Sequence, residues 1–281
     1  MTPYPGLRPH PWSRAFAWTP RTGPFVRLSR EQAAHYDANG FIAIEDALAP
    51  ELVAELIARI DPLEARVDAF LREQPEQRAF IADARAITFT VNPAGRDARL
   101  RELISSRVFA ELAHDLLGGE VRLYWDQAVY KKSERPAAFG WHQDNAYGFV
   151  SPQGYLTFWI ALNDATRENG CLEVLPGLHA LGTLAHATSR DGIFLDLPDP
   201  LPPNLPAPLA LPLRAGSLVA MSSLLPHRTG PNNTPRVRKA YIVQCCEERS
   251  VTWHGDARRP EPERREPVAA LPGTRQWRLA L

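Results

Sequence analysis

Residues 139–150 read F-G-W-H-Q-D-N-A-Y-G-F-V, and the rest of the chain can be understood as a fold built around this stretch. His142 and Asp144 lie two residues apart among aromatic and small residues that favour a strand. Side chains alternate between the two faces of a strand, so both are expected to point the same way. One imidazole and one carboxylate, joined by a third ligand, form the facial triad that holds non-haem Fe(II). The pair alone is weak evidence, since His-x-Asp arises by chance and most such pairs are a solvated turn histidine beside an acid.

Length and composition favour a single globular domain. The chain has 281 residues, of which 44% are hydrophobic and 23% are charged. Its 32 basic and 32 acidic residues give no net charge, which argues against nucleic acid or an anionic membrane as a partner. No apolar run approaches the roughly 20 residues of a membrane span, and the first residues lack the apolar stretch of a secretory signal. The three cysteines are odd in number and disfavour a disulfide framework, so we expect a cytoplasmic protein.

The first part of the chain is predicted to be mainly helical. Ser29 is a helix cap, with Gln32 at the capping-box position and Asn39-Gly40 as the stop. A long amphipathic segment covers residues 50–73, and Pro62 is expected to kink or divide it. Its predicted apolar face consists of Leu52, Leu56, Ile60, Leu63, Val67 and Phe70. Further elements are strands at 41–45 and 87–91 and one or two helices over 99–117, ending at Gly118-Gly119.

From Val121 onward the pattern changes to short strands separated by turn residues. This order of elements predicts an antiparallel sandwich or barrel buttressed by helices. The proline-rich residues 193–212 are expected to form an irregular surface loop or lid. We expect one domain over 1–281, with an extended arm at 1–28, helical support at 29–120, a β core at 121–246 and a surface tail at 247–281. The predicted strands are 121–130, 140–144, 156–163, 171–174, 209–213, 217–221, 227–229 and 239–246.

The third metal ligand is predicted to be a histidine on a late strand. Among the eight histidines, His227 ends an apolar strand and is followed eleven residues later by Arg238. His179 and His186 follow a turn and are assigned structural hydrogen bonds. An imidazole followed by a deeply placed arginine suits a 2-oxoglutarate site, because a guanidinium pairs bidentately with the far carboxylate while the metal takes the keto-acid end.

Three ordered blocks carry a family resemblance. They are W-H-Q-D at 141–144, W-x-x-L-x-D-A-T-x-E-N-G-C-L-x-V-L-P-G-x-H at 159–179, and H-R-T-G-P-N-N-T-P-R-V-R-K-A-Y at 227–241. The chain resembles the phytanoyl-CoA dioxygenase family of Fe(II)- and 2-oxoglutarate-dependent oxygenases, densely over residues 121–246 and more loosely before. The resemblance implies a double-stranded β-helix, that is, a jelly-roll barrel. It also implies Fe(II), 2-oxoglutarate and O2, and the hydroxylation of an unactivated C–H bond with release of succinate and CO2.

The resemblance also assigns roles to individual residues. His142, Asp144 and His227 match the iron ligands. Arg238 matches the arginine that binds the distal carboxylate of 2-oxoglutarate, and Thr229 matches a hydroxyl that assists it. Trp159 matches a tryptophan beside the co-substrate, and Lys131 stands where the family often has a contacting lysine, although Lys132 leaves the register open.

Several alternatives stand beside these assignments. Arg236 competes with Arg238, and Trp159 is equally explained as a core residue. A Zn²⁺-binding or non-catalytic barrel is the alternative class, because two histidines and a carboxylate also suit zinc. The substrate is expected to be a small metabolite or natural product. Gln127, Gln143, Tyr147, Phe149 and the loop at 193–207 are candidates for the pocket wall.

Overall fold

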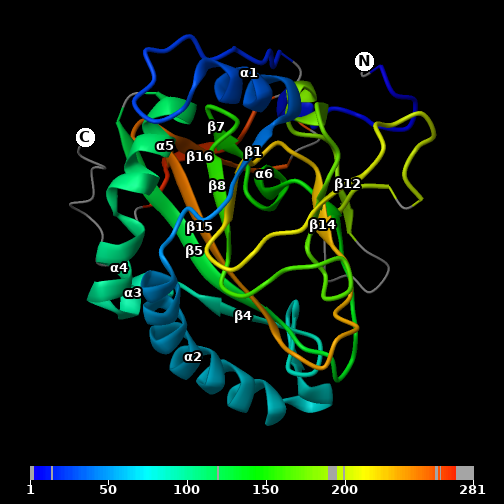
Figure 1. The fold of residues 1–281 in the computed structure, drawn as a ribbon. Helices are drawn as coiled ribbons and strands as arrows, with labels where there is room; N and C mark the ends of the chain where they lie inside the picture. Colours follow the sequence, from blue (N-terminus) through cyan, green and yellow to red (C-terminus); the bar gives the residue numbers. More distant parts are fainter. Residues whose placement is uncertain are drawn as a thin grey trace.

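The computed structural model describes residues 3–13, 15–118, 120–188, 195–198, 200–256, 259 and 261–269. Two antiparallel sheets form its centre (Figure 1). The larger sheet runs in the order β1 (Phe41–Ile44), β13 (Leu218–Ser222), β8 (Leu156–Ala161), β15 (Arg238–Glu247), β5 (Val121–Lys131), β4 (Ile87–Val91), β3 (Ala82–Asp83) and β2 (Arg78–Ala79). The smaller sheet runs in the order β12 (Leu209–Leu211), β9 (Leu172–Val174), β14 (His227–Thr229) and β6 (Phe139–His142). The predicted β-barrel is confirmed, and each strand predicted after Val121 is present with slightly shifted ends.

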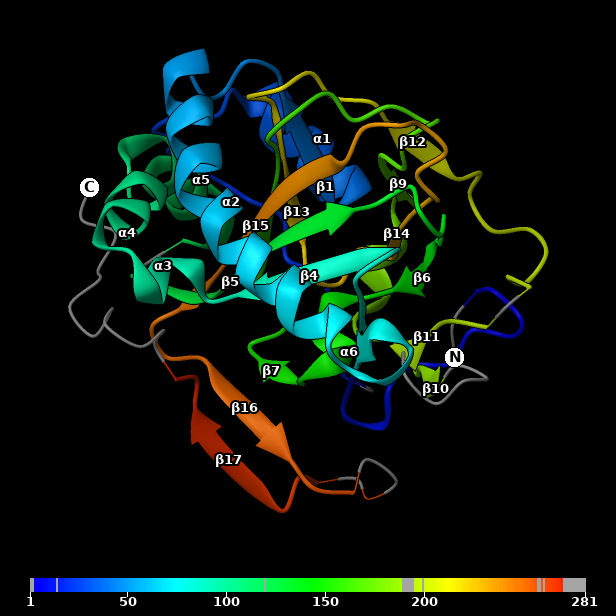
Figure 2. The ribbon, with the colours of Figure 1, turned by 90° about the horizontal axis from the view of Figure 1, so that it is seen from below.

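Helices α2 to α5 gather on the outer face of the larger sheet (Figures 1 and 2). Leu56 and Ile60 of one helix and Phe109 of another are buried in the same core cluster as Phe158 and Ile160 of β8. This burial of apolar faces from both layers is what holds the helices to the barrel. The helices are α1 (Arg30–Asn39), α2 (Pro50–Arg72), α3 (Pro93–Arg96), α4 (Ala98–Ile104), α5 (Arg107–Leu117) and α6 (Asp144–Tyr147), with 3-10 turns at Pro11–Ser13, Pro75–Gln77 and Leu178–Leu181.

The first helix has the predicted boundaries and caps. The Ser29 hydroxyl accepts the N–H of Gln32 at 3.2 Å, and the Gln32 side chain accepts the N–H of Ser29 at 2.9 Å. Gly40 ends the helix with φ of 83°, in the left-handed region that glycine adopts without strain. The capping box and the stop read from the sequence are both confirmed.

Helix α2 is one continuous helix of 23 residues that contains Pro62, so the expected division does not occur. Two lysines, one directly after β5 and one on β15, form ion pairs with it. Lys132 Nζ lies 2.8 Å from a Glu64 oxygen, and Lys239 Nζ lies 2.7 Å from an Asp61 oxygen. Phe70, which the sequence places on the apolar face, is 54% exposed because the buried row runs instead through Val53, Leu56, Ile60, Glu64 and Leu71.

A β-bulge interrupts β5 where it pairs with β15. Cys245 pairs with Leu123 and Gln244 pairs with Trp125, which leaves Tyr124 as the extra residue. Before the bulge Leu123 faces the helices, and after it Ala128 and Tyr130 do. The bulge therefore shifts the alternation of the strand by one residue.

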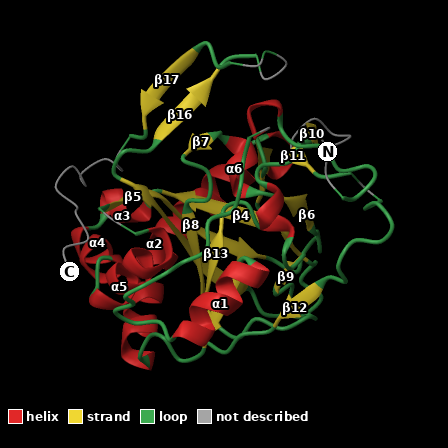
Figure 3. Cartoon of the chain, turned by 90° about the horizontal axis from the view of Figure 1, so that it is seen from above, coloured by secondary structure: helices red, strands yellow, loops and turns green. Residues whose placement is uncertain are grey.

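Two smaller sheets complete the fold. β10 (Ala187–Thr188) pairs with β11 (Leu195–Asp196), and β16 (Val251–His254) pairs with both β17 (Arg264–Pro267) and β7 (Val150–Ser151). The β16–β17 hairpin extends away from the barrel (Figures 2 and 3), in the part of the chain that the sequence predicts to be a surface tail. The end of the tail, residues 270–281, lies outside the described residues.

Candidate metal centre and co-substrate cavity

Three side chains converge where β6 ends and β14 begins. His142 and His227 are direct partners across this antiparallel pair, and their ring centroids are 4.1 Å apart. Asp144 Oδ1 lies 3.7 Å from His142 Nε2 and 3.6 Å from His227 Nε2. One ligand atom from each residue lies within 4.8 Å of the others, and the described residues contain no second cluster of this kind. The structure thus brings together the three predicted ligands, although they come from separate parts of the chain.

The local structure of Asp144 differs from the prediction. β6 ends at His142, and Asp144 is the first residue of the short helix α6, not part of the strand. Gln143, which lies between them, still has extended backbone, so the side chains of His142 and Asp144 point to the same side as the alternation predicts. Only the assignment of Asp144 to the strand itself is wrong.

Hydrogen bonds orient the carboxylate of Asp144. Its Oδ2 accepts the Thr157 hydroxyl at 2.6 Å and the Gln244 amide at 3.0 Å, and these two donors also contact each other at 3.1 Å. The other oxygen, Oδ1, is left to face both histidines. Neither Thr157 nor Gln244 is predicted from the sequence as a site residue. Both belong to strands that pair with each other at this level, β8 and β15, and only the sheet register reveals that.

Both imidazoles are held so that Nε2 points to the centre. Nδ1 of His142 lies 2.9 Å from the Gly140 carbonyl, and Nδ1 of His227 lies 3.0 Å from the Leu225 carbonyl. A proton on Nδ1 donates to the carbonyl and leaves the Nε2 lone pair free for a metal. Burial, together with the nearby His227, lowers the pKa of His142 well below its ordinary value, which favours the neutral form that a metal requires.

Arg238 lies at the closed end of the same cavity and is 1% exposed. Its Nε has no hydrogen-bond partner, its Nη1 only approaches the Val129 carbonyl at 3.5 Å, and no acidic side chain among the described residues pairs with it. Burial lowers its pKa to about 10, so it is still a cation at neutral pH. A buried, unpaired guanidinium fits an anionic ligand, and the carboxylate of 2-oxoglutarate matches it. Arg236 is exposed and lies before the strand, which favours Arg238 over its competitor.

Other predicted co-substrate residues lie around Arg238. Trp159 lines the cavity, and the guanidinium carbon of Arg238 is 5.2 Å from its ring centroid. Thr229 also lines the cavity and is 9% exposed. Lys131 lines it too, but its ammonium donates to the carbonyls of Ala137, Thr229 and Gly230. These three carbonyls hold Lys131 at the closed end of the cavity, and its contact with 2-oxoglutarate stays a prediction.

The candidates for the pocket wall separate into two groups. Gln127 and Tyr147 line the cavity. Gln143 does not: it is fully buried, donates to the carbonyls of Gly182 and Leu224, and accepts the N–H of Leu184.

Phe149 packs away from the cavity. Its ring lies against His10 at 4.9 Å, Trp12 at 5.5 Å and Trp253 at 5.2 Å. Among the described residues of the loop at 193–207 none lines the cavity, and Leu197, for example, packs in a cluster with Leu7 of the arm. For both the loop and Phe149, nearness in sequence to β6 does not predict a place in the cavity wall, because the chain leaves the cavity after α6.

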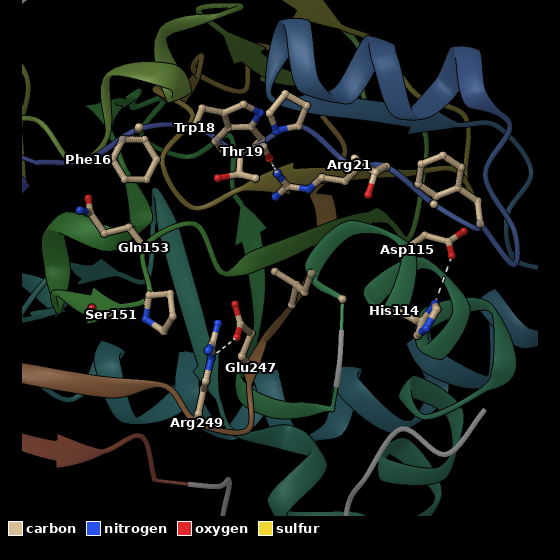
Figure 4. Close-up of a pocket in the computed structure, with 18 of the residues that line it drawn as sticks. Phe16, Trp18, Thr19, Arg21, His114, Asp115, Ser151, Gln153, Glu247 and Arg249 are labelled. Carbon is tan, nitrogen blue, oxygen red and sulfur yellow. Dashed lines mark hydrogen bonds and ion pairs between the residues drawn. The ribbon is translucent and has the colours of Figure 1, made fainter.

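A second hollow, of about 900 Å³, lies between the N-terminal arm and α5 (Figure 4). Its polar groups serve the protein itself. Asp115 accepts the backbone N–H groups of residues 26–28, and Arg249 donates to Glu247 at 2.6 Å. Arg21 donates to the Leu116 carbonyl at 2.9 Å. The hydrogen bonds around this hollow therefore attach the N-terminal arm to α5. The candidate metal centre lies in the smaller cavity.

The barrel, the His-Asp-His group and the buried arginine define a non-haem iron oxygenase that uses 2-oxoglutarate. The sequence model of phytanoyl-CoA dioxygenase (PhyH) matches residues 36–240, and the chain belongs to this family. The enzyme class expected from the resemblance is confirmed, with Fe(II) as cofactor and with 2-oxoglutarate and O2 as co-substrates. None of the described helices has the length and apolar character to cross a membrane.

Individual relatives align with this chain over most of their length. The chain is 24% identical over 273 residues to phytanoyl-CoA dioxygenase of Arabidopsis thaliana, covering 84% of this chain and 96% of the relative. It is 27% identical over 222 residues to methylphosphonate hydroxylase of Gimesia maris, covering 77% and 80%. The crystal structure of EvdO2 from Micromonospora carbonacea var. aurantiaca complexed with 2-oxoglutarate has a TM-score of 0.62 at 26% identity, covering 80% of this chain and 93% of that one.

Proposed function

We propose that this enzyme hydroxylates an unactivated C–H bond of a small metabolite or natural product, with one O2 and one 2-oxoglutarate converted to the new hydroxyl, succinate and CO2. The observation that supports this is one cavity holding both the three-ligand centre and the unpaired Arg238. When bound, iron and 2-oxoglutarate supply the activation of O2.

The chain's own residues bind and orient in this proposal. His142, Asp144 and His227 hold the metal on one side and leave the other side open. Arg238 binds the distal carboxylate of 2-oxoglutarate with help from the Thr229 hydroxyl, and Trp159 packs beside it. No side chain is needed as a general acid or base. The three cysteines are free and buried, which supports a reducing, cytoplasmic setting.

The test of this function is succinate formation in air with added Fe(II), ascorbate and 2-oxoglutarate, followed by a metabolite-extract screen for compounds that stimulate it. We expect Asp144→Ala to abolish turnover, because the carboxylate is the anionic ligand of the centre. Consumption of 2-oxoglutarate by Asp144→Ala at the wild-type rate would overturn the proposal.

A second variant pair tests the co-substrate assignment. Arg238→Leu should raise the KM for 2-oxoglutarate at least about 30-fold, since truncating one partner of a buried charge pair costs about 2–5 kcal/mol. Arg236→Leu is the matched control, because that side chain is exposed outside the cavity, and its KM should not change. Equal effects of the two variants would reject Arg238 as the carboxylate site.

The alternative, a Zn²⁺-binding or non-catalytic barrel, gives Arg238 no role. It predicts tight zinc binding and no 2-oxoglutarate consumption with Fe(II). The same assay therefore separates the two classes.

A further inference from the structure

Each charged side chain that lines the cavity of the metal centre already has a partner in the protein or an assigned ligand. The cavity has a volume of about 350 Å³, at the small end of ligand sites, and must hold 2-oxoglutarate and part of the substrate. Apart from the two histidines, its described lining has three charged side chains. Asp144 is bound by Thr157 and Gln244, Lys131 by backbone carbonyls, and Arg238 lies at the closed end for the co-substrate. The described lining that remains for a substrate is uncharged.

The open side of the cavity carries an aromatic rim, which we define as Tyr124, Trp125 and Tyr147. Trp125 is 36% exposed and Tyr147 is 44% exposed, whereas Arg238 at the closed end is 1% exposed. Trp125 pairs with Gln244, which donates to Asp144, so the rim lies at the level of the iron ligands. A substrate that presents a C–H bond to the metal must therefore pass along these rings.

The β-bulge is what places two of these rings together. Neighbouring residues of a regular strand face opposite sides, yet Tyr124 and Trp125 both line the cavity. The extra residue at Tyr124 turns its ring inward, where it packs edge-on against Tyr155 at 5.1 Å. Bulges beside active sites commonly re-aim a side chain in this way.

The wall next to the rim is apolar. It consists of Ile81, Ile87, Phe89 and Phe139, and the two phenyl rings are 5.9 Å apart. The nearest neutral polar group on β5 is Gln127, whose side-chain amide makes no hydrogen bond with the described residues. A carboxylate or phosphate placed against this surface loses its water and finds no free counter-ion among the described lining residues, whereas a flat apolar ring gains contact area and stacking.

We propose that the cavity binds an uncharged, ring-bearing hydrophobic group of the substrate, stacked on the aromatic rim and hydrogen-bonded through a single neutral oxygen to Gln127. Groups that carry a carboxylate or phosphate are excluded from this part of the cavity. This assignment rests on the proposed function, because it names the substrate class of the same site.

The probes are 2-naphthol and 2-naphthoate, which share a ring system and differ in charge at pH 7. Each is titrated by calorimetry into the protein loaded with Fe(II) and 2-oxoglutarate under argon, so that no turnover occurs. We expect 2-naphthol to bind at least about tenfold more tightly than 2-naphthoate, a ratio that corresponds to 1.4 kcal/mol. Equal binding, or tighter binding of 2-naphthoate, overturns the proposal.

Two variants locate the effect. Trp125→Ala should weaken 2-naphthol about tenfold, whereas Phe70→Ala, an exposed aromatic on α2 away from the cavity, should leave it unchanged. Gln127→Lys introduces an ammonium beside the rim and should reverse the preference towards 2-naphthoate. This reversal is a gain of binding, so a merely unstable variant cannot produce it, and its absence in folded Gln127→Lys protein counts against the assignment.

A separate titration of 2-oxoglutarate into the Fe(II)-loaded protein, with the two probes also titrated into protein that holds Fe(II) alone, separates this inference from the proposed function. Wild-type protein that binds 2-oxoglutarate but prefers 2-naphthoate refutes the substrate class alone. Protein that prefers 2-naphthol but does not bind 2-oxoglutarate refutes the proposed function alone.

Discussion

At the scale of single residues, the two oxygens of Asp144 have different tasks. Oδ1 faces the two histidines, while Oδ2 is held by Thr157 and Gln244. Groups that hydrogen-bond to a metal ligand fix its orientation, and their loss typically costs 10–100-fold in metal affinity. Thr157 is therefore a positioning residue for the centre.

We predict that Thr157→Val weakens Fe(II) binding about tenfold, because the isosteric side chain removes one of the two donors to Asp144. Thr90→Val is the matched control: Thr90 is also fully buried in the larger sheet, but its hydroxyl has no partner. Metal titration without 2-oxoglutarate measures both variants and does not depend on turnover. Equal affinities for the two variants would show that the hydroxyl does not position the carboxylate.

The site residues that the sequence predicts correctly are those that stand in family motifs. His142, Asp144, His227 and Arg238 belong to family motifs with characteristic spacing, and the structure places all four at one cavity. Positions that depend on the path of the chain beyond the strand are not visible in this way, and Phe149 packs against His10 and Trp253 instead of lining the cavity. Gln143, by contrast, follows strand alternation: it lies between two ligands, and its side chain is buried on the opposite face.

At the scale of elements, the alternation of apolar residues and the turn residues between them predict nearly every strand of the barrel. The irregular features escape this reasoning. Nothing in V-R-L-Y-W-D-Q distinguishes a bulge at Tyr124 from a regular strand, since the register with β15 decides it. The burial of Glu64 on α2 also has no local signal, because its partners Thr88 and Lys132 come from the sheet.

The contact between α2 and the sheet gives a stability prediction. Lys132→Met leaves Glu64, which is 7% exposed, without its cation, and we expect a loss of about 3 kcal/mol, because breaking a buried pair strands a charge. Thermal unfolding of the single and double variants measures this effect. Adding Glu64→Gln to Lys132→Met should restore much of the loss, and additive effects would contradict the pairing.

At the scale of the whole molecule, one buried carboxyl makes the stability depend on pH. Asp126 is fully buried between the sheet and α3, and burial raises its pKa from 3.8 to about 6. Hydrogen bonds from Tyr241 at 2.6 Å and from the N–H of Ala94 at 2.9 Å oppose this rise without cancelling it. The folded protein thus keeps a proton that the unfolded chain releases near pH 4.

The sign of the effect follows from that difference. The stability contributed by the protonated carboxyl is fully present below about pH 4 and is lost as pH rises through about 6. Asp126→Asn keeps a neutral group at this position. At pH 8 we expect its free energy of unfolding to exceed that of the wild type by up to about 3 kcal/mol, which thermal unfolding measures as a higher melting temperature. The advantage should shrink towards pH 4. A constant difference across this range would show that ionisation of Asp126 is not its cause.

The extra residue in β5 makes chain length, and not only side-chain identity, a determinant of what the enzyme accepts. Removing Tyr124 by deletion would restore an unbroken two-residue rhythm through β5. Leu123 would still face the helices, and Trp125 and Gln127 would still face the cavity, so the deletion would remove only the Tyr124 ring from the rim. A one-residue deletion elsewhere in β5 would instead move one part of the strand to the opposite face. The bulge is therefore the one place in β5 where chain length can change the lining of the cavity and leave the core-facing residues as they are.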